Sequence, residues 1–133
     1  MITAIIELTE NCNLCCTFCL RSSFKKQTMT VETLKRVIKE LLRYRKDRVD
    51  FVWHGGEPLI LGIDFYNKII EFQTKYKNQK TFIRNTIQTN ATLLTKEFQD
   101  FFQKHDFDIG TSIQGTKEIH DKTRIDMGGK GTY

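Results

Sequence analysis

All four cysteines of this chain lie in one short stretch, ENCNLCCTFCLR at residues 10–21. Cys12, Cys16 and Cys19 have the spacing C-x3-C-x2-C, and Cys15 is additional. Thiolates are soft ligands that suit zinc and iron–sulfur clusters. A structural zinc usually takes four ligands as two separated pairs, whereas the adjacent side chains of Cys15 and Cys16 diverge in most backbone conformations. Three ligands on a short loop predict a cubane cluster with one iron left open for a substrate.

The elements that must position these thiols follow from the hydrophobic pattern. Apolar, β-branched runs predict four strands, at residues 2–8, 49–53, 81–88 and 107–113. Helical spacing of apolar residues predicts three helices, one after Thr30, one over 63–76 and one after Thr95. In the third strand, Arg84 and Asn85 weaken the pattern.

This β-α-β-α-β-α-β order predicts a parallel sheet, because each helix supplies the crossover that parallel strands require. In α/β barrels the chemistry lies in loops at the carboxyl ends of the strands. The cysteines follow the first strand, and the other unusual segments follow the later strands in turn: HGGEP at 54–58, TN at 89–90 and SIQG at 112–115. We therefore expect an α/β fold, a partial (β/α) TIM-like barrel, with one shared site.

Composition limits the class of protein. The chain has 133 residues, with a hydrophobic fraction of 39% and a charged fraction of 28%, as in a soluble globular domain. No apolar run approaches the ~18 residues of a membrane span, and no signal peptide pattern is visible. We expect a cytoplasmic protein without a membrane partner, in a reducing compartment where clustered cysteines bind metal or do redox chemistry. The net charge of +5 is scattered, which favours solvated helix faces over a nucleic-acid surface.

The cysteine spacing, with the aromatic Phe18 before the last cysteine, resembles the hallmark of radical S-adenosylmethionine (radical SAM) enzymes. The GGEP segment at 55–58 after the second strand is a further match. IQTNATLL and SIQGTKEIHDKTRIDMGGKGTY look like the third- and fourth-strand segments of anaerobic sulfatase-maturating enzymes and related SPASM-type peptide maturases. The resemblance covers essentially the whole chain and identifies it as an N-terminal part of such an enzyme.

The resemblance implies an oxidoreductase with two cofactors, a [4Fe–4S] cluster and S-adenosylmethionine. In this family the fourth iron chelates the amino and carboxylate groups of S-adenosylmethionine, and one electron breaks its C–S bond to give methionine and a 5′-deoxyadenosyl radical. The implied partners are a peptide or protein substrate such as a sulfatase, whose Cys or Ser becomes formylglycine, and an electron donor such as flavodoxin or ferredoxin. The protein supplies ligation and orientation, while the cofactors carry the chemistry.

The resemblance also implies roles for single residues. The metal ligands are Cys12, Cys16 and Cys19, with Cys15 at a variable position. Phe18 is expected to pack beside the cluster. The expected cofactor-binding residues are His54, Gly55, Gly56, Glu57, Pro58, Asn90, Ser112 and Arg124.

Several of these roles have a structural alternative. The glycines let the backbone approach a ligand closely, and Glu57 is expected to accept from the cofactor's ammonium, whereas the alternative for the whole segment is a simple turn. Ser112 and Arg124 are expected to contact the methionine carboxylate or ribose, since an Arg fork suits a carboxylate. His54 and Asn90 either hold cofactor or serve the fold.

The chain departs from the family pattern in three ways. Gln114 stands where relatives usually have Asp, which replaces a carboxylate by an amide. Ala91 replaces the usual Gly, so its backbone must avoid a positive φ or accept strain. Relatives also have further βα units, so we expect residues 1–133 to be an incomplete radical SAM core whose catalytic acid lies beyond Tyr133 and which is inactive alone.

Two other functions fit the same residues. A maturase of another ribosomal peptide would differ only in features beyond Tyr133. A truncated, non-catalytic metal-binding module, for instance a zinc-binding relic, would hold zinc without sulfide, whereas the first interpretation requires iron with sulfide.

Overall fold

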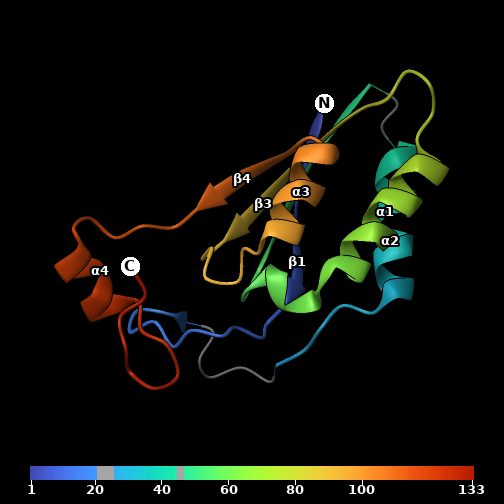
Figure 1. The fold of residues 1–133 in the computed structure, drawn as a ribbon. Coiled ribbons are helices and arrows are strands. Elements are labelled where there is room, and N and C mark those ends of the chain that lie inside the picture. Colours follow the sequence, from blue (N-terminus) through green and yellow to red (C-terminus); the bar gives the residue numbers. More distant parts are fainter. Residues whose placement is uncertain (21–25, 45–46) are drawn as a thin grey trace.

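The computed structural model describes residues 1–20, 26–44 and 47–133. Its elements alternate as the sequence predicts (Figure 1). In chain order they are β1 (Ile2–Thr9), α1 (Val31–Tyr44), β2 (Arg48–Gly55), the 3-10 helix η2 (Pro58–Leu61), α2 (Ile63–Tyr76), β3 (Phe82–Thr89), α3 (Lys96–Lys104), β4 (Phe107–Thr111) and α4 (Lys117–Thr123). None of the described helices is long and apolar enough to cross a membrane.

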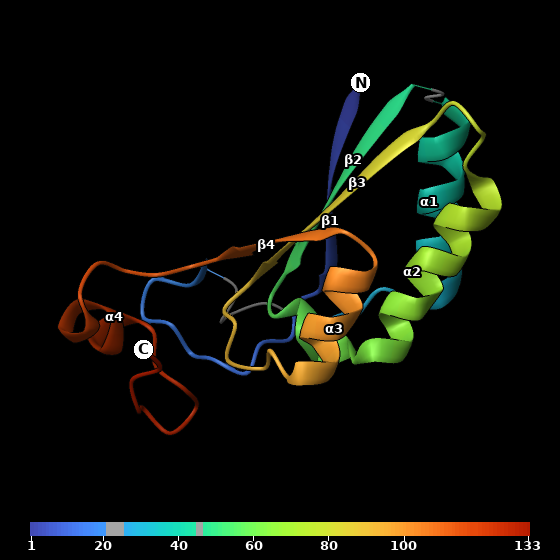
Figure 2. The same cartoon turned by 45° about the horizontal axis from the view of Figure 1, so that its top comes forward.

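The strands form one parallel sheet in the order β1-β2-β3-β4, which confirms the predicted partial barrel. Helices α1, α2 and α3 lie on the same side of this sheet (Figures 1 and 2). The alternation of side chains along β1 shows the two faces: Ile6 and Leu8 are buried toward the helices, while Ile5 and Glu7 are exposed on the opposite face. The fold therefore has an apolar layer on one side and an open, more polar face on the other.

The apolar layer is built around aromatic rings. Tyr66 of α2 is fully buried, and its ring meets those of Phe98, Phe102 and Phe107 edge-on at centroid distances of 5.7, 5.5 and 6.4 Å. Edge-to-face pairs of this kind are favourable beyond their buried area. They fix α2 and α3 against the sheet, so the strand ends that carry the polar segments are held by a rigid core.

The two polar residues that weaken the third strand's pattern lie on opposite faces of the sheet. Asn85 is buried among the helices, where its Oδ1 accepts from Trp53 Nε1 at 2.9 Å and from Gln73 Nε2 at 2.8 Å. Arg84 lies on the open face and pairs with Asp108 of β4 at 2.6 Å. A buried polar group with satisfied hydrogen bonds does not disrupt a strand, so the alternation is preserved although the sequence looks irregular.

The structure differs from the sequence-based expectation near its end. The fourth strand ends at Thr111 instead of Ile113, and α4 was not predicted. Helix α4 has one buried residue, His120, so it lacks the apolar stripe by which a helix is recognised in sequence. Thr116 caps it without a side-chain hydrogen bond.

The sequence left two possibilities for Ala91, a backbone that avoids a positive φ or one that accepts strain. The structure shows the second. The φ of 63° at Ala91 lies in the left-handed region, which costs an L-residue about 1–2 kcal/mol. The turn is held by Ala91 N, which donates to Thr89 Oγ1 at 3.0 Å, and by Leu94 N, which donates to Ala91 O at 3.1 Å.

We expect Ala91→Gly to raise the free energy of unfolding by about 0.5–1 kcal/mol, because glycine removes the left-handed strain at a smaller entropic cost. Urea unfolding of the metal-free protein measures this change. The matched control is Ala4→Gly within β1, which should lower stability because glycine weakens a strand interior. An Ala91→Gly variant that is less stable than the parent would contradict this account.

Candidate functional site

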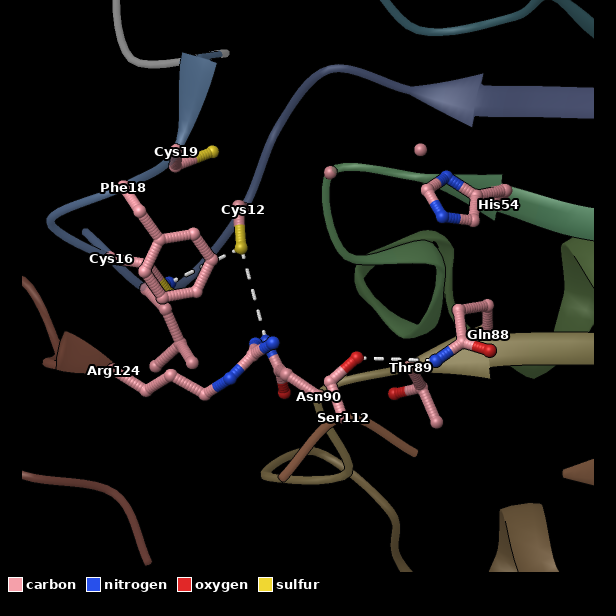
Figure 3. Close-up of a pocket in the computed structure, with 13 residues that line it drawn as sticks. Cys12, Cys16, Phe18, Cys19, His54, Gln88, Thr89, Asn90, Ser112 and Arg124 are labelled. Atoms are coloured by element: carbon pink, nitrogen blue, oxygen red, sulfur yellow. Dashed lines mark hydrogen bonds between the residues drawn. The ribbon is translucent and has the colours of Figure 1, made fainter. Parts of the chain in front are cut away.

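A pocket of about 250 Å³ lies where the carboxyl ends of the strands meet (Figure 3). Every segment that the sequence singled out contributes to it. Its lining consists of Cys12, Leu14, Cys16, Phe18, Cys19, His54, Gly55, Gly56, Gln88, Thr89, Asn90, Ser112 and Arg124. The predicted site residues that do not border this pocket are Glu57 and Pro58, and Cys15, which was not predicted to be a ligand, does not border it either.

All four cysteines border a neighbouring pocket, but Cys12, Cys16 and Cys19 also border this one, whereas Cys15 is exposed and does not. Cys19 N donates to Cys16 O at 3.0 Å, which closes a tight turn between the last two ligand candidates. Within the described parts of the chain, no three His, Cys, Asp or Glu side chains are placed to hold a single metal ion. Soft thiols around one pocket fit the donor set of an iron–sulfur cluster.

The loop that carries the thiols is attached to the segment after α4. Cys15 N donates to Ile125 O at 2.8 Å, and Thr17 N donates to Thr123 O at 2.9 Å. Leu14 and Asp126 form an antiparallel bridge beside these bonds. Backbone pairing to residues more than 100 positions away therefore holds the cysteine loop in place.

The protein environment favours the neutral thiol at two of these positions. Burial raises the pKa of Cys12, and the charge of Glu57 adds to this effect. Burial also raises the pKa of Cys16, although the nearby Arg124 guanidinium acts in the opposite direction. Metal binding must displace these protons, so the affinity of the loop for metal should rise with pH.

Gly55 and Gly56 allow β2 to end directly against the start of the cysteine loop. A Cβ on Gly56 would lie 2.1 Å from Asn11 O, and one on Gly55, whose φ is 138°, would lie 2.4 Å from Thr9 O. Gly56 N also donates to Thr9 O at 2.6 Å. The glycines border the pocket, and the close approach that requires them is to the protein's own backbone.

The carboxylate of Glu57 is fully buried beneath the pocket. Its Oε1 accepts from Leu59 N at 3.0 Å and from Thr89 Oγ1 at 2.7 Å, and its Oε2 accepts from Asn90 N at 2.8 Å. Glu57 thereby caps η2, in which Pro58 is the first residue, and ties it to the end of β3.

The expectation that Glu57 accepts from the cofactor's ammonium stays a prediction. The carboxylate has no exposed surface and is already held by three donors of the chain. Its observed contacts give it a positioning role, and Pro58 is likewise buried. The pocket's polar surface comes from other residues.

Polar side chains from neighbouring strands line the open-face side of the pocket. Trp53 pairs with Ile87, so His54 and Gln88 follow at adjacent positions on β2 and β3. Gln88 Nε2 donates to Ser112 Oγ at 3.1 Å, and a Cβ on Gly110 would lie 2.4 Å from Gln88 Oε1. The sequence analysis did not single out Gln88; the available signal was its position beside His54 at the end of an aligned strand.

Asn90 contacts both the cysteine loop and its own turn. Its Nδ2 donates to Asn13 Oδ1 at 3.0 Å and lies 3.8 Å from Cys12 Sγ, while its Oδ1 accepts from Thr92 N at 3.0 Å. Hydrogen bonds to ligand sulfurs help set the potential of iron–sulfur clusters. Asn90 is therefore placed to orient Cys12.

Arg124 enters the pocket from the end of α4, beside the half-exposed ring of Phe18 (Figure 3). The guanidinium carbon lies 5.2 Å from the centroid of this ring, a cation–π distance. Its Nε and Nη2 donate to Gln114 Oε1 at 3.2 and 3.1 Å. Arg124 and Ser112 thus bring a cation and a hydroxyl to the same pocket as the thiols.

Comparisons with known proteins point to one family. The model of the Radical SAM superfamily matches residues 6–133. The cysteine-type anaerobic sulfatase-maturating enzyme of Clostridium novyi (strain NT) is 36% identical over 132 residues, which covers 94% of this chain and 35% of that protein. The serine-type anaerobic sulfatase-maturating enzyme of Bacteroides thetaiotaomicron is 39% identical over 130 residues, which covers 92% of this chain and 31% of that protein.

Solved structures agree with this result. The structure of anSMEcpe with bound AdoMet matches with a TM-score of 0.90 and 34% identity, over 97% of this chain and 36% of that one. The structure of native anSMEcpe with bound AdoMet and the Cp18Cys peptide also matches with a TM-score of 0.90, at 32% identity and the same coverage. The chain spans about a third of the length of the curated relatives it matches.

We expect Glu57→Gln to lower the free energy of unfolding by about 1.5–3 kcal/mol, the range for hydrogen bonds to a charged group. An amide offers one acceptor atom where three donors converge. Urea unfolding of the metal-free protein tests this, with the exposed Glu40→Gln as the matched control, which should change stability by less than about 0.5 kcal/mol. Equal stability of the two variants would assign Glu57 no role in the fold.

In the metal-free protein, iodoacetamide should modify the exposed Cys15 about ten times faster than Cys12, because burial and a raised pKa both lower the reactivity of a thiol. Peptide mass spectrometry during the reaction gives the rate at each cysteine. Repeating the reaction in concentrated urea provides the control, since the difference should then vanish. Equal rates in the folded protein would contradict the described orientation of the loop.

Proposed function

Because the chain belongs to the Radical SAM superfamily, we propose that Cys12, Cys16 and Cys19 bind a [4Fe–4S] cluster and that the adjoining pocket receives S-adenosylmethionine. The observation that carries this proposal is the position of the three thiols. They border one pocket together with polar groups from the ends of the other strands. Cys15 is exposed on the neighbouring pocket and is assigned no ligand role.

When bound, the cluster supplies one electron to the sulfonium of S-adenosylmethionine, whose C–S bond then breaks to methionine and a 5′-deoxyadenosyl radical that takes a hydrogen atom from the substrate. The chain's own residues bind and orient S-adenosylmethionine. We propose that Arg124 and Ser112, which both border the pocket, hold the methionine carboxylate, because a guanidinium and a hydroxyl are donors that suit a carboxylate. We propose that the cofactor's ammonium lies beside Gly55 and Gly56, which border the pocket at the end of β2.

The remaining pocket residues protect and align this site. Leu14 and Phe18 place apolar surface beside the thiols and limit the access of water. Asn90 orients Cys12 by its contact with the sulfur. His54 and Gln88 extend the pocket across the open face of the sheet, where they are placed to meet the cofactor or the substrate.

The substrate assignment rests on the relatives. They include cysteine-type and serine-type sulfatase-maturating enzymes, and anSMEcpe was solved with the Cp18Cys peptide. We propose that the whole protein oxidises a Cys or Ser of a sulfatase to formylglycine in the cytoplasm, with electrons from flavodoxin or ferredoxin. Since the relatives are about three times as long, we expect the peptide and adenine sites to need more than these 133 residues.

Single Cys→Ala changes at Cys12, Cys16 or Cys19 should each abolish a stable cluster, because a three-cysteine cluster has no spare protein ligand. Cys15→Ala is the matched control and should keep most of the iron. Iron and sulfide per chain after anaerobic reconstitution measure this, and S-adenosylmethionine should change the electron paramagnetic resonance spectrum of the reduced protein. We expect no formylglycine from the 133-residue chain alone.

Two outcomes would contradict the proposal. Zinc without sulfide in the purified protein would indicate a metal-binding module of another kind. An equal loss of iron in Cys15→Ala and Cys16→Ala would show that the ligands are assigned incorrectly.

A further inference from the structure

Arg124 is held by a neutral partner. Its Nε and Nη2 both donate to the amide oxygen of Gln114, at 3.2 and 3.1 Å. The arginines on the open face are held differently: Arg48 pairs with Asp50 at 2.8 Å, and Arg84 pairs with Asp108 at 2.6 Å. A carboxylate partner offsets the charge of a guanidinium, whereas an amide oxygen orients it and leaves the charge available.

The pair is fixed through His120, in the middle of α4. Gln114 N lies 3.4 Å from His120 Nδ1 and donates to it, while Arg124 N donates to His120 O at 2.7 Å. Thr132 Oγ1 donates to Arg124 O at 2.8 Å. The ring of Phe18 covers one side of the guanidinium at 5.2 Å. These contacts leave Arg124 little freedom to turn, and they direct it into the pocket that contains Ser112 (Figure 3).

We propose that Gln114 is a positioning residue which aims the uncompensated charge of Arg124 at the carboxylate of the bound ligand and so selects ligands that carry one. This rests on the proposed function of the pocket as the S-adenosylmethionine site. The residue type matters because Glu would have the same shape and the same acceptor oxygen as Gln114, yet would add a negative charge beside the ligand's carboxylate.

The expected loss of affinity in Gln114→Glu follows from Coulomb's law. Two carboxylates a few ångströms apart near a protein surface repel each other at an effective dielectric constant of about 20. Solvent and relaxation reduce this effect. We therefore expect Gln114→Glu to weaken S-adenosylmethionine binding about tenfold.

The test compares two ligands on the anaerobically reconstituted protein. S-adenosylmethionine carries the carboxylate, and decarboxylated S-adenosylmethionine keeps the sulfonium and the ammonium without it. Calorimetry should show that Gln114→Glu weakens the binding of S-adenosylmethionine about tenfold and leaves the binding of decarboxylated S-adenosylmethionine unchanged or tighter. Gln114→Asp, a second variant that adds the same charge, should show the same selectivity. Gln103→Glu on the exposed side of α3 is the matched control and should leave both affinities unchanged.

The outcomes separate this inference from the function on which it rests. An equal loss of affinity for both ligands in Gln114→Glu and Gln114→Asp would overturn it and leave Gln114 with a purely structural role. A reconstituted parent protein that binds neither ligand would overturn the proposed function and this inference with it.

Discussion

Glu57, whose carboxylate is buried, joins the parts of the site that come from three strands. The backbone N of Glu57 donates at 2.7 Å to the carbonyl oxygen of Asn11, the residue directly before the first cysteine. The side chain of Glu57 accepts from Thr89 Oγ1 and Asn90 N at the end of β3. A buried charge is costly unless donors of the chain surround it. Here three donors do so, and they tie the segment after β2 to the end of β3. The separate backbone bond to Asn11 adds the end of β1 to this arrangement. The strand ends that Glu57 holds together form the wall of the pocket.

The two faces of the sheet divide the work between stability and chemistry. The helix-covered face carries the aromatic core around Tyr66, and its buried polar residue Asn85 is fully paired with Trp53 and Gln73. The open face carries charged and polar side chains, among them His54 and Gln88 beside the thiols. Because strand residues alternate between the faces, the same short strands provide a rigid support and a polar surface without compromise between them.

The sequence was sufficient to predict the order of elements, since three of the four α-helices and three of the four strands have a clear apolar pattern, and the third strand has a weakened one. Divergence of adjacent side chains predicted only that Cys15 or Cys16 points away, and the resemblance to the family motif selected Cys15, which is the exposed one of the two. The sequence did not reveal α4, whose residues carry no apolar stripe, or the orientation of Glu57. The motif shows that a carboxylate follows two glycines, but its partner Thr89 lies 32 residues further along the chain, and only the folded sheet brings them together.

The cysteine loop is held by contacts within the chain. Its backbone pairs with residues 123–126, so folding itself contributes to the order of the loop. The same pairing places Arg124 beside Phe18, between the thiols and the segment that follows β4. One short antiparallel contact therefore sets both the position of the ligands and the position of the cation. A change in residues 123–126 would alter metal binding and cofactor binding together, although none of these residues is a cysteine.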